Sequence, residues 1–399
     1  METTSLNDET LATAATEPAL LVDLPSMLPD DVGPFLRRLD EVSAGWSVTV
    51  AVPDGLEESL PETRLKVIGH PPAASATTWT LTSADYVNAY ELAQAHEARA
   101  VLLLGAEARS LEPDAIRRMI RAVADQQIDL VMPRYTLPPR AGLVNSAILY
   151  PISRALFGAA PRFPLAIDTC FSMRMAERLA IAGRLPRGAT EGDGLVWAVS
   201  EAVSAGFSIT QVDAGTRALP QPTGLDLNSV LAQVTGSLFA DVETKAAFWQ
   251  RSRVAKVGPL SGTANQEIDA PQDEASGMIE GFRMAYTNLA EIWSLVLPPQ
   301  TLLGLKRLSV APAESFTMPD SLWARIVYDF LVAYRLRTIN RGHLLGALTP
   351  LYLAWVASHL VQTAEHRDYE RHIEAVAVAF EADKPYLVSR WRWPDRFNP

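Results

Sequence analysis

The first half of this 399-residue chain alternates short apolar runs with segments of helical spacing. Such alternation is typical of βαβ units, in which strands lie side by side in a largely parallel sheet and helices cover its faces. It predicts an α/β fold whose sheet ends near residue 220. The apolar runs expected to be strands are 19–26, 47–55, 64–70, 100–107, 128–135, 163–175 and 207–219.

The second half has a different pattern, in which amphipathic helical segments follow one another without strands. A chain of this length exceeds one ordinary core, so we expect two units: an α/β domain over 18–225 and a helical domain over 226–399. Residues 1–17 are polar and acidic, which predicts a disordered lead-in rather than a signal peptide. The Gly, Pro, Ser and acidic content near 257–277 predicts a flexible connection.

Several local features of the helices follow from single residues. The helix over 83–100 is expected to be capped by Ser83 or Asp85. The apolar stretch 344–361 approaches the length of a membrane span, but Pro350 and His359 favour a buried helix pair interrupted at the proline.

Composition excludes several classes of protein. A formal net charge of −11 opposes binding to nucleic acid. The single cysteine, Cys170, allows neither an internal disulfide nor a cysteine zinc site, and it suits the cytoplasm. The six histidines lack the spacing of a zinc site, and His366 and His372 fit a solvated helix face. Motifs of P-loop, Rossmann and serine-hydrolase enzymes are absent from the sequence.

Ligands of open α/β sheets bind beyond the carboxyl ends of the strands. Polar residues at these positions are therefore candidates for a site, although acids there also cap helices and turns. The candidates are Ser26, Asp54, Glu107, Arg134, Asp168 and Asp213.

Several segments, taken in order, resemble one family. MPRYTLPPRAGLVNSAILYPISRALFG at 132–158 and FPLAIDTCFS at 163–172 are similar to the P-R-Y, D-G-T-x-x-N, Y-P-L-T-R-A-L-Y-G and Q-P-I-G-G-D-F-G-F-S pattern of retaining GT-A glycosyltransferases, which include glucosyl-3-phosphoglycerate and mannosylglycerate synthases. Segments 321–334, 342–361 and 384–391 also resemble parts of these relatives, so the likeness covers about 19 to 395. It implies a GT-A fold with a helical C-terminal unit.

The resemblance also implies a reaction and a set of residues. Relatives transfer a hexose from a nucleotide diphosphate to a small acceptor such as a glycerate, with Mg²⁺ or Mn²⁺ at the departing diphosphate. By position, Pro25, Ser26 and Asp54 would bind the donor nucleotide, and Glu107 would be the metal-binding acid of D-x-D. Asp168 would border the reacting sugar as the catalytic residue. The acceptor side would be formed by Arg134 and Asn145.

The sequence departs from this pattern at the metal and donor positions. The first acid of D-x-D is Gly105, the late metal-binding histidine is Leu219, and the acid of a helix motif is Leu195. The G-K-G donor contact falls on 81–83, and the acceptor D-G-T acid and threonine are Ala141 and Leu143. Leucine cannot bind a cation, and one carboxylate is a thin ligand set for Mg²⁺ or Mn²⁺.

Two hypotheses remain open. In the first, the chain is a cytoplasmic glycosyltransferase. Its site either holds a weakly bound metal at Glu107 or is metal-free, with Arg109, Arg134 or Arg217 offsetting the diphosphate charge. Alternatively, it is a non-catalytic relative that binds a ligand or serves as a scaffold. A homodimer is expected from the relatives alone.

Overall fold

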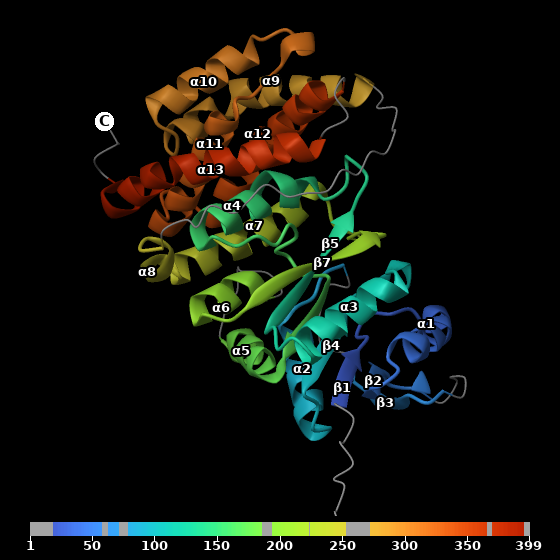
Figure 1. Ribbon diagram of the computed structural model, residues 1–399. Coiled ribbons are helices and arrows are strands. Elements are labelled where there is room, and N and C mark those ends of the chain that lie inside the picture. The colour runs from blue at the N-terminus through green and yellow to red at the C-terminus, as the bar shows by residue number, and fades with distance from the viewer. Residues whose placement is uncertain are drawn as a thin grey trace, which may run out of the picture.

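The computed structural model describes residues 19–57, 63–71, 79–185, 194–222, 224–252, 272–364 and 369–394. Its seven-stranded sheet has the order β3-β2-β1-β4-β6-β5-β7. The pairs β1–β2, β2–β3, β1–β4 and β5–β7 are parallel, and β6 runs antiparallel to both β4 and β5. The predicted α/β class, with a mostly parallel sheet and a helical C-terminal region, is confirmed (Figure 1).

Strands form where the sequence has its apolar runs, because side chains on both faces of the sheet are covered. All five residues of β4 are buried. The elements of the α/β part are β1 (Ala19–Asp23), α1 (Pro29–Val42), β2 (Ser47–Pro53), β3 (Lys66–His70), α2 (Ser83–Ala95), β4 (Ala100–Leu104), α3 (Pro113–Ala124), β5 (Leu130–Thr136), α4 (Tyr150–Phe157), β6 (Asp168–Ser172), α5 (Met173–Arg184), α6 (Ala198–Ala205) and β7 (Ile209–Thr216).

The antiparallel direction of β6 decides where Asp168 lies. In the register between β4 and β6, Leu104 at the end of β4 pairs with Asp168 at the start of β6. Asp168 therefore reaches the carboxyl edge of β4 although it begins its own strand. A π-helical turn, Asn145–Leu149, leads directly into α4, so Pro151 lies within a continuous helical run.

The C-terminal part is entirely helical within the described residues. Its helices are α7 (Leu227–Thr244), α8 (Ala246–Trp249), α9 (Gln272–Ser294), α10 (Pro299–Ser309), α11 (Asp320–Leu336), α12 (Arg341–Thr363) and α13 (Tyr369–Arg392). Figure 1 shows these helices stacked on one side of the α/β part.

The prediction of a helix pair interrupted at Pro350 is wrong. Helix α12 is continuous, with Pro350 inside it, because its neighbours α7, α9 and α11 pack along it and outweigh the local cost of the proline. Among the described residues, α12 is the one helix long and apolar enough to cross a membrane, and 67% of its apolar window is buried inside the protein.

The two parts share a continuous core. Helix α4 packs on α13, and one apolar cluster includes residues from the sheet and from the helical part. Arg154 of α4 is paired with Glu374 and Glu381 of α13, and Trp323 Nε1 donates to the Ala147 carbonyl over 2.8 Å. These contacts bury polar and apolar groups of both parts at their junction.

The start of α2 and the segment near 257–277 differ in part from the predictions. Thr82, not Ser83 or Asp85, precedes α2, and the Asp85 carboxylate accepts hydrogen bonds from the Thr82 backbone N–H and hydroxyl, 2.7 and 2.8 Å away. Residues 272–277 of the predicted flexible connection belong to α9, whereas the rest of 257–271 and the lead-in 1–17 lie outside the described residues.

The side chain of His372 is only 10% exposed, so its assignment to a solvated helix face is wrong. His372 stacks on His359 with 4.9 Å between ring centroids. Its Nε2 lies 3.1 Å from Asp320 Oδ1. His366 lies outside the described residues.

Candidate functional site

Most of the candidates from sequence gather at the carboxyl edge of the sheet. Pro25 and Ser26 form the turn after β1 and are half-buried, and Asp54 is exposed after β2. Glu107 follows β4, and the β4–β6 register brings Asp168 to the same edge. Asp213, by contrast, lies within β7, where its carbonyl accepts from Arg118.

Asp168 lies in a completely buried ion pair with Arg217. Its Oδ2 accepts hydrogen bonds from Arg217 Nε at 2.9 Å and from the Tyr135 hydroxyl at 2.7 Å. Its Oδ1 accepts from Arg217 Nη2 at 3.1 Å and from the Gly105 amide at 3.3 Å. Both Asp168 and Arg217 side chains are 0% exposed, so no ligand touches this carboxylate in the observed conformation.

Arg217 uses all of its donors inside the protein. Besides the two bonds to Asp168, Nη2 donates to the Ala106 carbonyl at 2.7 Å, and Nη1 donates to Ser110 Oγ at 3.1 Å and to the Ala218 carbonyl at 2.8 Å. Burial alone would lower the pKa of this guanidinium, but the Asp168 carboxylate raises it. The charge of Arg217 is thus already balanced by Asp168 in this structure.

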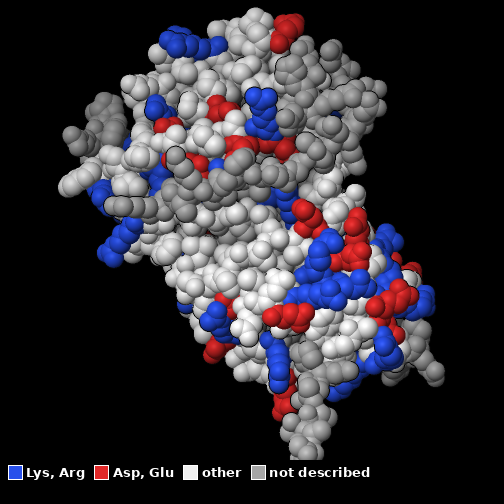
Figure 2. Space-filling view, in the orientation of Figure 1, with Lys and Arg blue, Asp and Glu red and all other residues white. Residues whose placement is uncertain are grey.

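Glu107 is the remaining acid of the metal motif, and it is 30% exposed. Its backbone is left-handed, with φ of 62°, an uncommon conformation for a residue with a side chain. Its carboxylate accepts from Arg109 Nε at 3.2 Å, and Arg109 also pairs with Asp31 at 3.2 Å. Figure 2 shows basic and acidic residues interleaved over α1 and α3, so this face carries balanced charge.

The residues around Glu107 do not fit a divalent cation. Among the described residues, no group of three or more His, Cys, Asp or Glu side chains is placed to hold a metal. A Cβ on Gly105 would lie 2.6 Å from the Ile167 carbonyl oxygen, and the Gly105 amide donates to that oxygen at 2.8 Å. An aspartate at position 105 would therefore collide with the backbone that precedes β6.

Apolar side chains occupy the other substituted positions. Leu81 is buried, and its amide donates to the Ala166 carbonyl at 3.3 Å. Leu195 is also buried, while Ile167 and Leu219 pack against the apolar cluster on one side of the sheet. Full burial of side chains such as those of Leu81 and Leu195 stabilises a fold by about 1.5–3 kcal/mol each. The substitutions thus contribute to packing rather than to ligand binding.

On the acceptor side, Asn145 serves as a link within the protein. Its Nδ2 donates to the Arg162 carbonyl at 2.8 Å, and its Oδ1 is buried without a hydrogen-bond partner among the described residues. Arg134 is half-buried on β5, at an irregularity in its pairing with β7.

Arg162, whose carbonyl accepts from Asn145, was not predicted as a site residue. Its guanidinium is 3% exposed, lies between the rings of Tyr150 and Phe163 at 5.1 and 5.0 Å, and donates to Glu370 at 3.2 Å. Glu370 is 208 residues away along the chain, and no sequence spacing relates the two.

A second buried polar pair, also missed from sequence, lies at the ends of β1 and β3. His70 Nδ1 lies 2.8 Å from the Pro71 carbonyl, which can only accept, so this nitrogen carries a proton. His70 Nε2 lies 3.2 Å from Asp23 Oδ1, so that contact also requires a proton. Burial raises the pKa of Asp23; it would lower that of His70, but Asp23 raises it. The pKa values of Asp23 and His70 are thus both above their ordinary values, so each group keeps its proton to a higher pH than it would in water.

Comparisons with known proteins find only distant structural likeness. No family model and no curated protein matches the chain. A solved structure of a mycobacterial protein is 14% identical, with 57% of this chain and 74% of that chain covered and a TM-score of 0.39. Glucosyl-3-phosphoglycerate synthase from Mycobacterium tuberculosis, in complex with Mn²⁺, UDP-glucose and phosphoglyceric acid, is 15% identical, with 57% and 79% covered and a TM-score of 0.40.

The same synthase in complex with Mg²⁺ and UDP is 15% identical, with 57% and 79% covered and a TM-score of 0.38. These likenesses concern overall architecture only.

Proposed function

We propose that this chain is a non-catalytic protein of the glycosyltransferase type, which acts by binding and does not transfer a sugar. One observation carries the proposal: Asp168, the residue expected at the reacting sugar, is fully buried and has four hydrogen-bond donors around its two oxygens. A carboxylate that borders a reacting sugar needs a face open to the substrate. Here that face is occupied by Arg217.

The charge of the site supports the same proposal. Transfer from a nucleotide diphosphate requires positive charge at the departing oxygens. Arg217 is neutralised by Asp168, and Arg109 by Glu107 and Asp31. The carboxylates present do not fit Mg²⁺ or Mn²⁺, so we derive no catalytic step through a metal.

A second function is favoured by one specific observation: the donor side is still partly accessible. Asp54 is exposed, Pro25 and Ser26 are half-buried, and the Arg109 side chain is 56% exposed. A metal-independent hexosyltransferase would use these residues for the nucleotide, Arg109 and Arg134 for the anionic groups, and a small glycerate-like acceptor. It would require the Asp168–Arg217 pair to open when the donor binds.

One experiment separates the two functions. Purified protein is incubated with UDP-glucose or GDP-mannose and 3-phosphoglycerate, with and without Mn²⁺, and transferred hexose is measured alongside calorimetric titration with UDP. We expect no hexose transfer by the wild-type protein, and none by Glu107→Gln. Turnover that is lost in Asp54→Ala and in Arg109→Ala, with the fold intact by circular dichroism, would overturn the non-catalytic proposal.

A further inference from the structure

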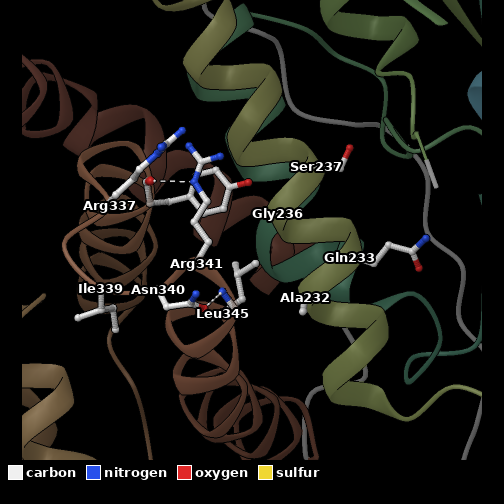
Figure 3. A pocket seen from close by; sticks show the side chains of 11 residues that line it. Ala232, Gln233, Gly236, Ser237, Arg337, Ile339, Asn340, Arg341 and Leu345 are labelled. Carbon is white, nitrogen blue, oxygen red and sulfur yellow. Dashed lines mark hydrogen bonds between the residues drawn. The ribbon is translucent and has the colours of Figure 1, made fainter. Parts of the chain in front are cut away.

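A cavity of about 690 Å³ lies in the helical part, away from the residues discussed above. It is formed by α7, the end of α11 and the start of α12 (Figure 3). Its size falls within the range of small-molecule sites. The lining residues are Ala232, Gln233, Gly236, Ser237, Tyr334, Arg337, Ile339, Asn340, Arg341, Gly342 and Leu345.

The charge of this lining is opposite to that of the protein. The chain has a net charge of −11, yet the lining residues include two arginines and no acid; one of them, Arg341, pairs with Glu243 beside the cavity, which leaves the positive charge of Arg337. Guanidinium groups remain protonated at all physiological pH values. An electropositive hollow in an acidic protein attracts an anion, because the field lines of like charges concentrate in a low-dielectric concavity.

Arg341 is held in place beside the cavity. Its Nε donates to the Tyr334 carbonyl at 3.2 Å, its Nη2 donates to Glu243 at 2.9 Å, and its guanidinium lies 3.9 Å from the centre of the Tyr334 ring. These contacts order the side chain before any ligand arrives. Preorganisation lowers the entropic cost of binding.

Arg337 is exposed and lies at the residue that ends α11, with a left-handed φ of 54°. Helix ends of this kind usually carry glycine, since a Cβ is disfavoured there. Within the described residues, no carboxylate pairs with the Arg337 guanidinium. Figure 3 shows the Arg337 and Arg341 side chains extending toward the same end of the cavity.

The rest of the cavity is largely apolar. Ala232, Ile339 and Leu345 line it together with the Tyr334 ring. Gly236 allows α7 and α12 to meet closely at this point, since a Cβ there would lie 2.9 Å from Leu345 Cδ1. A ligand that fills the cavity therefore needs an anionic group at one end and an apolar body at the other.

We propose that this cavity binds a small phosphate monoester with an apolar or aromatic body. The Arg337 guanidinium supplies positive charge at one end of the cavity, with Arg341 held beside it by Glu243 and Tyr334, and guanidinium forks match the geometry of phosphate oxygens. This cavity takes no part in sugar transfer. It lies on α7, α11 and α12, whereas the residues proposed for sugar transfer lie at the edge of the sheet. Its ligand is recognised by the helical part alone.

The test uses the full chain and phenyl phosphate, with phenol and inorganic phosphate as comparison probes, in isothermal titration calorimetry at pH 7.5. We expect phenyl phosphate to bind more tightly than inorganic phosphate, and phenol not to bind. Arg337→Gly should weaken phenyl phosphate binding by at least tenfold. Glycine suits the left-handed backbone at 337, so this variant is expected to fold.

The control variant is Lys306→Ala, which removes one exposed positive charge from α10, outside the cavity. It should bind phenyl phosphate as the wild-type protein does. Equal binding by the wild-type protein and Arg337→Gly would overturn the proposal, and so would an equal loss in Lys306→Ala, which would indicate attraction by net charge only. Failure of this site would leave the proposal about Asp168 untouched, because that one is tested by hexose transfer.

Discussion

Two arginine sites in this molecule, at the sheet edge and in the helical part, differ in how far the protein satisfies them. Arg217 is fully buried and directs five donors to a carboxylate, a hydroxyl and two carbonyls. Arg337 is exposed beside a cavity that contains no acid. A guanidinium with all donors used is part of the fold. An exposed guanidinium that lines a cavity and pairs with no described carboxylate has donors left for a ligand.

The largest effect should come from Arg217→Met. Removal of the guanidinium leaves Asp168 buried with a charge and two lost donors, which costs about 3–5 kcal/mol of unfolding free energy. Urea denaturation followed by tryptophan fluorescence measures the loss. If Arg217 instead serves mainly to bind a ligand, the variant would lose less than about 1 kcal/mol of unfolding free energy.

The matched control is the double variant Asp168→Leu/Arg217→Met. Replacing a buried ion pair by apolar residues is often neutral, because the desolvation cost of both charges disappears. We expect the double variant to recover most of the stability lost in Arg217→Met. A double variant as unstable as the single one would mean that the bonds of Arg217 to Ala106, Ser110 and Ala218 matter more than its charge pairing.

Arg154 offers an intermediate case that sharpens the comparison. Its side chain is 3% exposed, but its partners Glu374 and Glu381 are 24% and 17% exposed. Arg154→Met should cost about 2–3 kcal/mol, since the carboxylates left behind still reach water. Thermal unfolding measures this. Arg325→Met, whose arginine is 41% exposed in its pair with Asp383, is the surface control and should change stability by less than about 1 kcal/mol.

A pH dependence follows from the Asp23–His70 pair. The pKa of His70 is raised in the folded protein, so its stabilising proton is fully bound below pH 6.5 and is lost as the pH rises through the folded pKa. The raised pKa of Asp23 acts in the same direction. We expect the unfolding free energy to fall as the pH rises above 6.5, as measured by urea denaturation across a pH series.

Two variants assign this dependence. His70→Gln retains a donor toward Asp23 but does not titrate, so the part of the loss of stability above pH 6.5 that comes from His70 should disappear, while the part from Asp23 remains. Burial raises the pKa of Asp85 to about 6, and Asp85→Asn should therefore change the profile only between about pH 4 and 6. An unchanged slope above pH 6 in His70→Gln would show that the pair does not share a proton.

The sequence predicted the strands well, because apolar runs depend on local pattern. The edge rule placed Asp168 past the end of a strand, whereas it begins β6 and reaches the edge because β6 is antiparallel to β4. The state of Asp168 was not predictable, since its partner Arg217 lies 49 residues away and pairing at that separation leaves no periodic signal. Pro350 shows the same limit in reverse. Local rules predict a break, but packing of α12 against three other helices keeps it continuous.

The smallest effect compares left-handed residues that face a cavity with those that do not. Arg337 and Gln127 both have left-handed backbones, with φ of 54° and 57°. Glycine removes the Cβ conflict at such positions, so Arg337→Gly and Gln127→Gly should each raise the unfolding free energy by about 1 kcal/mol, as measured by urea denaturation. With saturating phenyl phosphate, the wild-type protein and Gln127→Gly should gain further stability, whereas Arg337→Gly should not. Equal gains in all three proteins would place the anion elsewhere and reduce Arg337 to an ordinary helix terminus.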